Sequence, residues 1–301
     1  MKESEPIRIE SAPLDTAFSN QFAKQQLLGK ITQASREYRI GTTWLKRPEG
    51  KPNETTYVFS NPEQLEDFCA LYDIWIFLSQ ESVDPPVYPE KILTRVARAR
   101  LTNSPLAIFT PWGPPYGLRQ EITQEELCIL KRFREVGNFF KKKQIPFVWL
   151  IMGADLYGTE VNPERIPQEV VDSYFANLEE AVSQASTEFT FKKWSQIRQE
   201  NMQIYSRLSQ QYDEEKIMGV LPKGVVDRAQ ATAQKMSGPE TAMAYLRERI
   251  LEAIIIENLC SPIKVSLAPK DKDTAVDMEL PRLYLVPPAL RTPWVKEGRT
   301  L

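Results

Sequence analysis

Two short apolar runs decide the fold: LAIFT at Leu106–Thr110 and FVWLIM at Phe147–Met152. Each run has the length of a buried strand, and prolines or glycines stand close to its ends. The segment between the runs carries a helix-start signature in Thr123 and Glu126, and three lysines at 141–143 suit the end of that helix. A strand, a helix and a second strand in this order predict a βαβ unit with two adjacent parallel strands.

Further helices and strands are expected before and after this unit in the sequence. Helices are expected from Pro89 and over residues 167–185, 191–212, 225–236 and 240–259, and late strands at Ile263–Leu267 and Leu283–Val286 rejoin the sheet. We therefore predict one α/β domain over residues 1–301, three-layered and Rossmann-like, with a mostly parallel sheet and additional helices. Its N-terminal part, residues 1–101, is expected to be mostly helical, and residues 104–301 to hold the sheet.

The composition of the chain argues against some classes of protein. The chain has 301 residues, 42% of them hydrophobic, and a net charge of −2, so nothing in its overall charge favours a nucleic-acid or membrane partner. The longest apolar stretch, Ile74–Leu78, is too short to cross a bilayer. The first residues lack the apolar core of a signal peptide, so a cytoplasmic location is expected.

The chain contains no histidine, which excludes Ser-His-Asp and Cys-His catalysis and any metal site with histidine ligands. Three widely spaced cysteines, Cys69, Cys128 and Cys260, are expected to be reduced and buried. No cofactor and no bound metal are predicted, and any proton transfer is left to other side chains.

The first candidate site follows the strand at Leu106–Thr110. Thr110, Trp112 and Tyr116 lie in the loop TPWGPPYG and are predicted to bind a substrate, with the two rings as an aromatic wall. The alternative is a rigid structural loop that buries both rings.

The second candidate site follows the strand at Phe147–Met152. Asp155 and Glu160 are the candidate catalytic carboxylates, Asp155 as a base or as the anchor of a substrate amine, because a charge directly after a buried strand is costly unless it binds something. Tyr157 and Asn162 are expected to line the same cleft. The alternative is that Asp155 caps a turn or the following helix.

The third candidate is Arg291, between Pro-Pro and Thr-Pro-Trp after the last strand, where a guanidinium could clamp a carboxylate or phosphate. The alternative is a surface anchor for the C-terminal tail. Loops after three strands converge only if all three strands are parallel, since parallel strands end at the same edge of a sheet.

The order of LAIFTPWGPPYG, a long helix, FVWLIMGAD and EVVDSYFANLEE resembles the core of the isocyanide synthase and dityrosine-biosynthesis family, over residues 104–180. The resemblance implies a Rossmann-like fold and an enzyme that converts the amino group of an amino acid to an isonitrile with a pentulose phosphate.

These observations favour a biosynthetic enzyme, a transferase or synthase of natural-product metabolism, that acts on an amino-acid-like or phosphorylated small molecule. Two alternatives stay open: a non-catalytic binding or scaffold protein on the same fold, and a glycosyl- or nucleotidyl-transferase with an unconventional site. The sequence does not fix the oligomeric state.

Overall fold

The computed structural model describes residues 7–10, 56–59, 70–71, 73–75, 77–78, 80–84, 86–115, 118–161, 166–211, 239–267 and 280–286. Its main sheet has five strands in the order β5-β4-β3-β6-β7, and all the pairings are parallel. The predicted α/β class is therefore confirmed. The strands are β3 (Leu106–Trp112), β4 (Phe147–Gly153), β5 (Phe189–Lys193), β6 (Ile263–Val265) and β7 (Arg282–Leu283).

The predicted βαβ unit forms as expected. Strands β3 and β4 are adjacent and parallel, with Leu106 opposite Phe147 and Trp112 opposite Gly153. The intervening helix α4 (Gln124–Lys142) starts with the capping box of Thr123 and Glu126, which satisfies N–H groups at the first turn. Local sequence signals therefore set both the start of α4 and the pairing of the strands that it connects.

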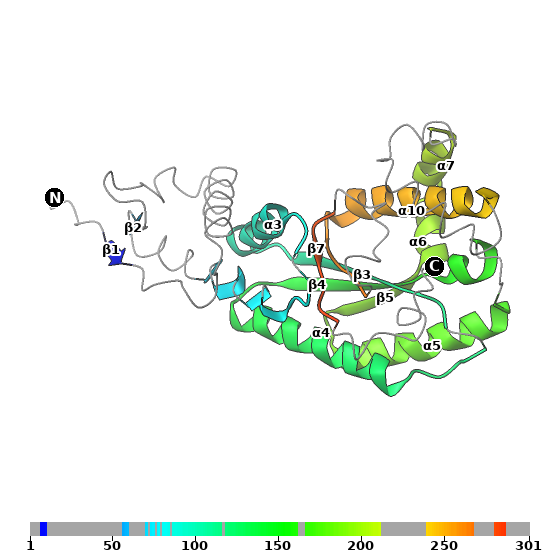
Figure 1. Cartoon of the computed structure of the whole chain (residues 1–301), viewed down its shortest axis with the longest axis horizontal. Helices are drawn as coiled ribbons and strands as arrows, with labels where there is room; N and C mark the ends of the chain where they lie inside the picture. Colours follow the sequence, from blue (N-terminus) through cyan, green and yellow to red (C-terminus); the bar gives the residue numbers. More distant parts are fainter. Residues whose placement is uncertain are drawn as a thin grey trace.

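Helices cover both faces of the sheet (Figure 1). One face packs against α4 and α5 (Gln168–Ala185), and the other against α6 (Trp194–Glu200), α7 (Met202–Gln211) and α10 (Pro239–Cys260). The connection from β5 to β6 returns across the sheet to the far side of β3. The chain therefore changes direction between β3 and β6, and such a switch point is where open α/β sheets bind ligands.

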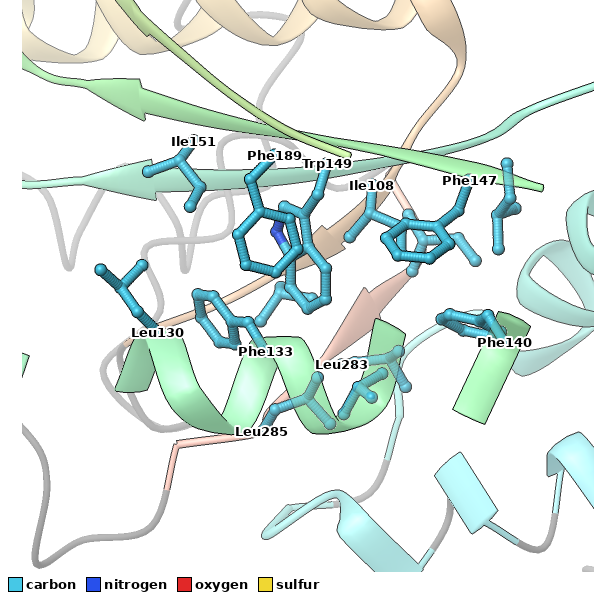
Figure 2. Close-up of a cluster of buried hydrophobic side chains, with 14 of the residues drawn as sticks. Ile108, Leu130, Phe133, Phe140, Phe147, Trp149, Ile151, Phe189, Leu283 and Leu285 are labelled. Carbon is cyan, nitrogen blue, oxygen red and sulfur yellow. The ribbon is translucent and has the colours of Figure 1, made fainter. Parts of the chain in front are cut away.

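Aromatic rings fill the core between the sheet and α4 (Figure 2). Trp149 of β4 stacks on Phe133 of α4 with 4.5 Å between ring centroids, and Phe189 of β5 meets Trp149 edge-on at 5.3 Å. At the end of β4, a Cβ on Gly153 would lie 2.8 Å from Phe191 and 2.9 Å from Phe175. Only glycine permits this close approach, so the core is packed tightly up to the carboxyl edge of the sheet.

The predicted helix over residues 191–212 is wrong in its first part. Residues Phe189–Lys193 form the edge strand β5, and α6 and α7 follow it. The strand forms because β4 offers an open edge there, and because Phe189 and Phe191 both face the aromatic core. The helices predicted at 167–185 and 240–259 correspond to α5 and α10. The one predicted at 225–236 lies outside the described residues.

Strand lengths also differ from the prediction. Strand β3 continues through Pro111 to Trp112, two residues beyond Thr110. Proline is tolerated there because β6 pairs with β3 at Ile108 and Phe109, so the missing N–H of Pro111 leaves that ladder intact. Strands β6 and β7 are shorter than expected, ending at Val265 and Leu283.

In the sequence before the main sheet, β1 (Ile7–Glu10) and β2 (Thr56–Phe59) form an antiparallel pair, and α3 (Pro89–Thr102) precedes β3.

The prediction that the cysteines are buried is wrong for the two that the described residues include. Cys128 is half-buried, and Cys260, the last residue of α10, is exposed. Desolvation of its sulfur and the charge of Glu257 raise the pKa of Cys260 to about 11. None of the helices in the described ranges is long and apolar enough to span a bilayer.

Candidate functional site

The carboxyl edge of the sheet carries two buried polar clusters, one on each face. The first, called the Glu126 network, lies on the side of α4 and α5 and joins the loop after β3 to both helices. The second, called the α10 cluster, lies on the opposite side, where α10 packs against the turn after β4 and against α7. Both clusters are next to the ends of β3, β4 and β5, which is the region where the sequence predicted a site.

The Glu126 network is centred on one buried carboxylate, 1% exposed. Arg119 donates to both of its oxygens at 2.7 and 2.9 Å, and the hydroxyl of Tyr174 donates to it at 2.6 Å. The indole N–H of Trp112 in turn donates to the Tyr174 hydroxyl at 2.9 Å. These bonds tie the loop after β3 to α4 and α5, so the network holds this loop in place.

Ionisation in the Glu126 network is set by these contacts. Burial alone would raise the pKa of Glu126, but hydrogen bonds from Arg119, the Thr123 backbone and Tyr174 together lower it below its usual value. Burial, reinforced by the charge of Glu126, pushes the pKa of Tyr174 far above that of an exposed tyrosine. The network is therefore a carboxylate–guanidinium pair with a neutral phenol at neutral pH.

The α10 cluster contains two buried glutamates one helical turn apart, Glu248 and Glu252, which are 7% and 2% exposed. Glu248 accepts from the indole N–H of Trp194 at 2.6 Å and from the Tyr205 hydroxyl at 2.8 Å. Glu252 accepts from the Tyr157 hydroxyl at 2.8 Å and from Arg249 at 2.6 and 2.7 Å.

Two arginines lie beside the glutamates of the α10 cluster. Arg198 lies 3.6 Å from both Glu248 and Glu160, and Arg249 pairs with Glu252. Burial would lower the pKa of Arg198, but the charge of Glu248 and neighbouring acidic groups raises it. Burial and Glu252 hold the pKa of Tyr157 well above its usual value. The two buried glutamates are matched by two guanidinium groups, and the exposed Glu160 brings the formal charge of these five side chains to −1.

Three predicted side chains after β3 and β4 are part of the protein interior. Thr110 is buried and accepts from the indole N–H of Trp149 at 2.9 Å, and Trp112 is buried against Tyr174. The expected aromatic wall is therefore wrong for Trp112, because its ring lies in the core beneath the sheet edge. Tyr157 is buried in the α10 cluster.

The two predicted catalytic carboxylates differ in exposure. Asp155 is buried and accepts from the backbone N–H of Ser195, the second residue of α6, at 3.0 Å. This is the capping arrangement weighed as the alternative, although the capped helix is α6 and not the helix that follows directly. Glu160 is exposed in the π-helical turn Tyr157–Val161 and faces Arg198. Tyr116, Asn162 and Arg291 lie outside the described residues.

Substituting Asp155 separates its capping role from its charge. Asp155→Ala should lower the free energy of unfolding by about 1–2 kcal/mol because the Ser195 N–H loses its acceptor, whereas Asp155→Asn should cost only a few tenths, since asparagine caps nearly as well. Urea denaturation of both variants measures this difference. An asparagine variant as unstable as the alanine variant would show that the negative charge itself is needed for folding.

Sequence reasoning missed Glu248, Glu252, Trp194 and Tyr205. A usable signal was present in α10, where both glutamates lie in the segment YLRERILEAIII, so apolar residues surround them on the helix. Among the described residues no group of three or more histidine, cysteine, aspartate or glutamate side chains is placed to hold a metal ion.

Comparison of the sequence with protein-family models and with curated proteins finds no match. Among solved structures, the PvcA protein from Pseudomonas aeruginosa is similar with a TM-score of 0.52 and 13% identity, over 75% of this chain and 87% of that protein. Tyrosyl-tRNA synthetase from Archaeoglobus fulgidus, solved with L-tyrosine, has a TM-score of 0.49 and 12% identity over 71% of this chain. This chain spans 63% of that synthetase. At these identities the likeness to PvcA shows a shared fold.

Proposed function

We propose that this chain is a biosynthetic enzyme that binds an amino-acid-like small molecule at the carboxyl edge of its sheet, where Glu248 of α10 holds the substrate ammonium group. The observation that carries the proposal is the burial of two glutamates on one face of a helix that packs over strand ends. Buried carboxylates are costly unless they are matched by donors or cations.

Glu248 has the capacity for one more partner. A carboxylate offers about four lone-pair positions, and Glu248 accepts two hydrogen bonds, from Trp194 and Tyr205, while Arg198 lies 3.6 Å from it. A primary ammonium group has three donors. A carboxylate that accepts hydrogen bonds favours a cation over an anion, so the chemistry of Glu248 fits the amino group of an amino acid.

The shared fold with PvcA is in keeping with the resemblance to the isocyanide synthase and dityrosine-biosynthesis family. Open α/β sheets bind ligands at such a switch point, and the one between β3 and β6 supports a substrate position at this edge of the sheet. Asp155 and Glu160 stay candidates for proton transfer under this proposal, with Glu160 the more accessible of the two. Conversion of the bound amino group is the reaction that this resemblance favours.

A direct test measures the binding of amino acids and of their des-amino analogues by calorimetry, at one pH and one ionic strength. We expect at least one amino acid to bind and its des-amino analogue to bind much more weakly. Glu248→Gln should weaken amino-acid binding roughly ten- to hundredfold, since hydrogen bonds to charged groups contribute about 1.5–3 kcal/mol. Failure of every amino acid to bind would overturn the proposal.

Glu257→Gln is the matched control for this test. It makes the same change on the same helix, but Glu257 pairs with Arg95 of α3 at 2.7 Å and lies outside the α10 cluster. Its affinity for the amino acid should equal that of the wild type. Equal losses in both variants would assign the effect of Glu248→Gln to helix stability and not to recognition of the ammonium group.

One observation favours the scaffold alternative. Asp155, Trp112 and Tyr157 all have hydrogen-bond partners within the protein, so each has a structural role without a ligand. A scaffold protein would bind no amino acid, sugar phosphate or nucleotide in a calorimetric titration and would bind a protein partner instead. A response to nucleotides alone would favour the transferase alternative.

A further inference from the structure

Arg198 of α6 meets its carboxylates in a different way from the other arginines that the structure describes in ion pairs. One of its Nη atoms lies 3.6 Å from an oxygen of Glu248, and the other lies 3.6 Å from an oxygen of Glu160. The other described arginine pairs are no longer than 2.7 Å, as in Arg249–Glu252 at 2.6 Å. Charge-assisted hydrogen bonds measure about 2.7–2.9 Å, so Arg198 is shared between two carboxylates and bonded directly to neither.

The guanidinium group of Arg198 can take a direct partner. It carries five N–H donors in a planar fork that matches the two oxygens of one carboxylate. Its central carbon lies 5.3 Å from the centroid of the Tyr205 ring, a cation–π contact that helps to hold the group in place. A ring and two carboxylates at 3.6 Å do not use the fork as a bidentate partner would.

Arg198 can be reached from solvent without an enclosed cavity. Its side chain is 23% exposed, and the side chain of Glu160, in the turn Tyr157–Val161, is 56% exposed. Glu248 lies deeper and is buried. The three charged groups therefore run from the surface inward in the order Glu160, Arg198, Glu248, and a small molecule that displaces Glu160 from Arg198 meets Glu248 next.

The spacing of Arg198 and Glu248 suits the two charges of an α-amino acid. Nη1 of Arg198 and Oε1 of Glu248 are 3.6 Å apart, and one group is a donor and the other an acceptor. In an α-amino acid a single carbon separates the ammonium group from the carboxylate group, so one ligand can pair with two protein groups that lie this close together. The exposed carboxylate of Glu160 stands beside Arg198 where the carboxylate of such a ligand would bind.

We infer that Arg198 binds the carboxylate group of the amino acid whose ammonium group Glu248 holds, and that Glu160 neighbours Arg198 in the free protein and is displaced by the ligand. The site then selects α-amino acids with a free carboxylate over their amides. This inference rests on the proposed function for the position of the ligand, and it adds a requirement for a carboxylate that the proposed function does not contain.

Calorimetric titrations of the full chain test this requirement. The probes are the common L-amino acids, among them L-tyrosine, L-tryptophan and L-leucine, each compared with its α-amide at about pH 6, where both carry the ammonium group. The amide should bind roughly ten- to hundredfold more weakly, because it lacks the charge that Arg198 binds. Equal binding of acid and amide overturns the inference and leaves the proposed function standing, since that concerns the ammonium group. Failure of every amino acid to bind overturns both.

Variants locate the carboxylate. In Arg198→Gln the ratio of the affinities for acid and amide should fall to about one, whereas Arg207→Gln, at an exposed arginine of α7, should keep the wild-type ratio. A merely structural role of Arg198 would weaken the binding of acid and amide alike and leave the ratio unchanged. A wild-type ratio in the folded Arg198→Gln variant would place the carboxylate elsewhere and overturn the inference.

Glu160→Gln tests the displacement and needs no change at Arg198. The variant removes the carboxylate that competes for Arg198, so the amino acid should bind several-fold more tightly while its amide binds as it does to the wild type. Should Arg198→Gln fail to fold, this variant and the comparison of acid with amide in the wild type decide the matter. Unchanged or weaker binding of the amino acid by Glu160→Gln would overturn the displacement of Glu160.

Discussion

Glu126→Gln should lower the free energy of unfolding by about 3 kcal/mol or more, because removing one member of a buried ion pair leaves the other charge uncompensated. The side chain of Glu126 is 1% exposed, whereas that of its partner Arg119 is 22% exposed. The guanidinium can regain some hydration, which keeps the expected loss at the lower end of the range for buried pairs. The loss includes the weakened capping box and the bond from Tyr174.

Urea denaturation at pH 7 measures this effect, and Glu125→Gln is its matched control. Glu125 is the neighbouring residue in the first turn of α4, but it is exposed. Its substitution should change the free energy of unfolding by no more than about 0.5 kcal/mol. A similar small change in Glu126→Gln would show that the carboxylate charge contributes nothing to stability.

The same variant should alter the response to acid. The pKa of Glu126 is lowered in the folded state, so its contribution to stability is present above the pKa of an unfolded glutamate, near 4.5. That contribution is lost as the pH falls through the lower, folded value. Between pH 5 and about pH 3 the wild type should therefore lose more stability than Glu126→Gln, which has no carboxyl group to protonate at this position.

Trp149→Ala should lower the free energy of unfolding by about 3–5 kcal/mol, the range for removing a large buried aromatic side chain. Trp149 has no exposed surface, stacks on Phe133 and meets Phe189 (Figure 2). Its indole N–H also donates to Thr110, whose hydroxyl would lose its partner. The cavity would lie between α4 and the centre of the sheet.

Val148→Ala is the control for this variant. Val148 precedes Trp149 on the same strand but points to the other face and is 46% exposed, so its truncation should cost less than about 1 kcal/mol. Urea unfolding followed by far-ultraviolet circular dichroism compares the two. A loss below about 2 kcal/mol in Trp149→Ala would mean that the surrounding rings collapse into the space that the indole leaves.

The sequence predicted the elements whose signals are local. Strands β3 and β4 are continuous apolar runs, and α4 has a capping signature at one end and lysines at the other, so the βαβ unit could be derived without tertiary information. Strand β5 could not, because FTFKK is short and leads directly into the helical pattern of α6. It becomes a strand only because β4 has a free edge beside it.

The candidate site was harder to predict, because the sequence shows which side chains are charged but not which of them are buried. A glutamate pair one turn apart on a helix usually marks a solvent-exposed face, and the apolar residues around Glu248 and Glu252 were the one local sign of their burial. Trp112 was expected to face a ligand, but the two-residue extension of β3 directs it into the core. Asp155 was predicted to be a base or an amine anchor, with a cap as the alternative, and its hydrogen bond from Ser195 of α6 is a capping contact that depends on the position of β5.

The position of β6 in the sheet has a consequence for how the protein assembles. Ile108 pairs with Ile263, a residue about half the chain length further on. During synthesis β3, β4 and β5 can pair well before β6 has emerged, and in that interval one side of β3 is an unpaired edge of apolar residues. Closing this pair carries the entropic cost of a very long loop. The final insertion of β6 beside β3 is therefore expected to be a slow step in folding, during which the chain is most prone to aggregate.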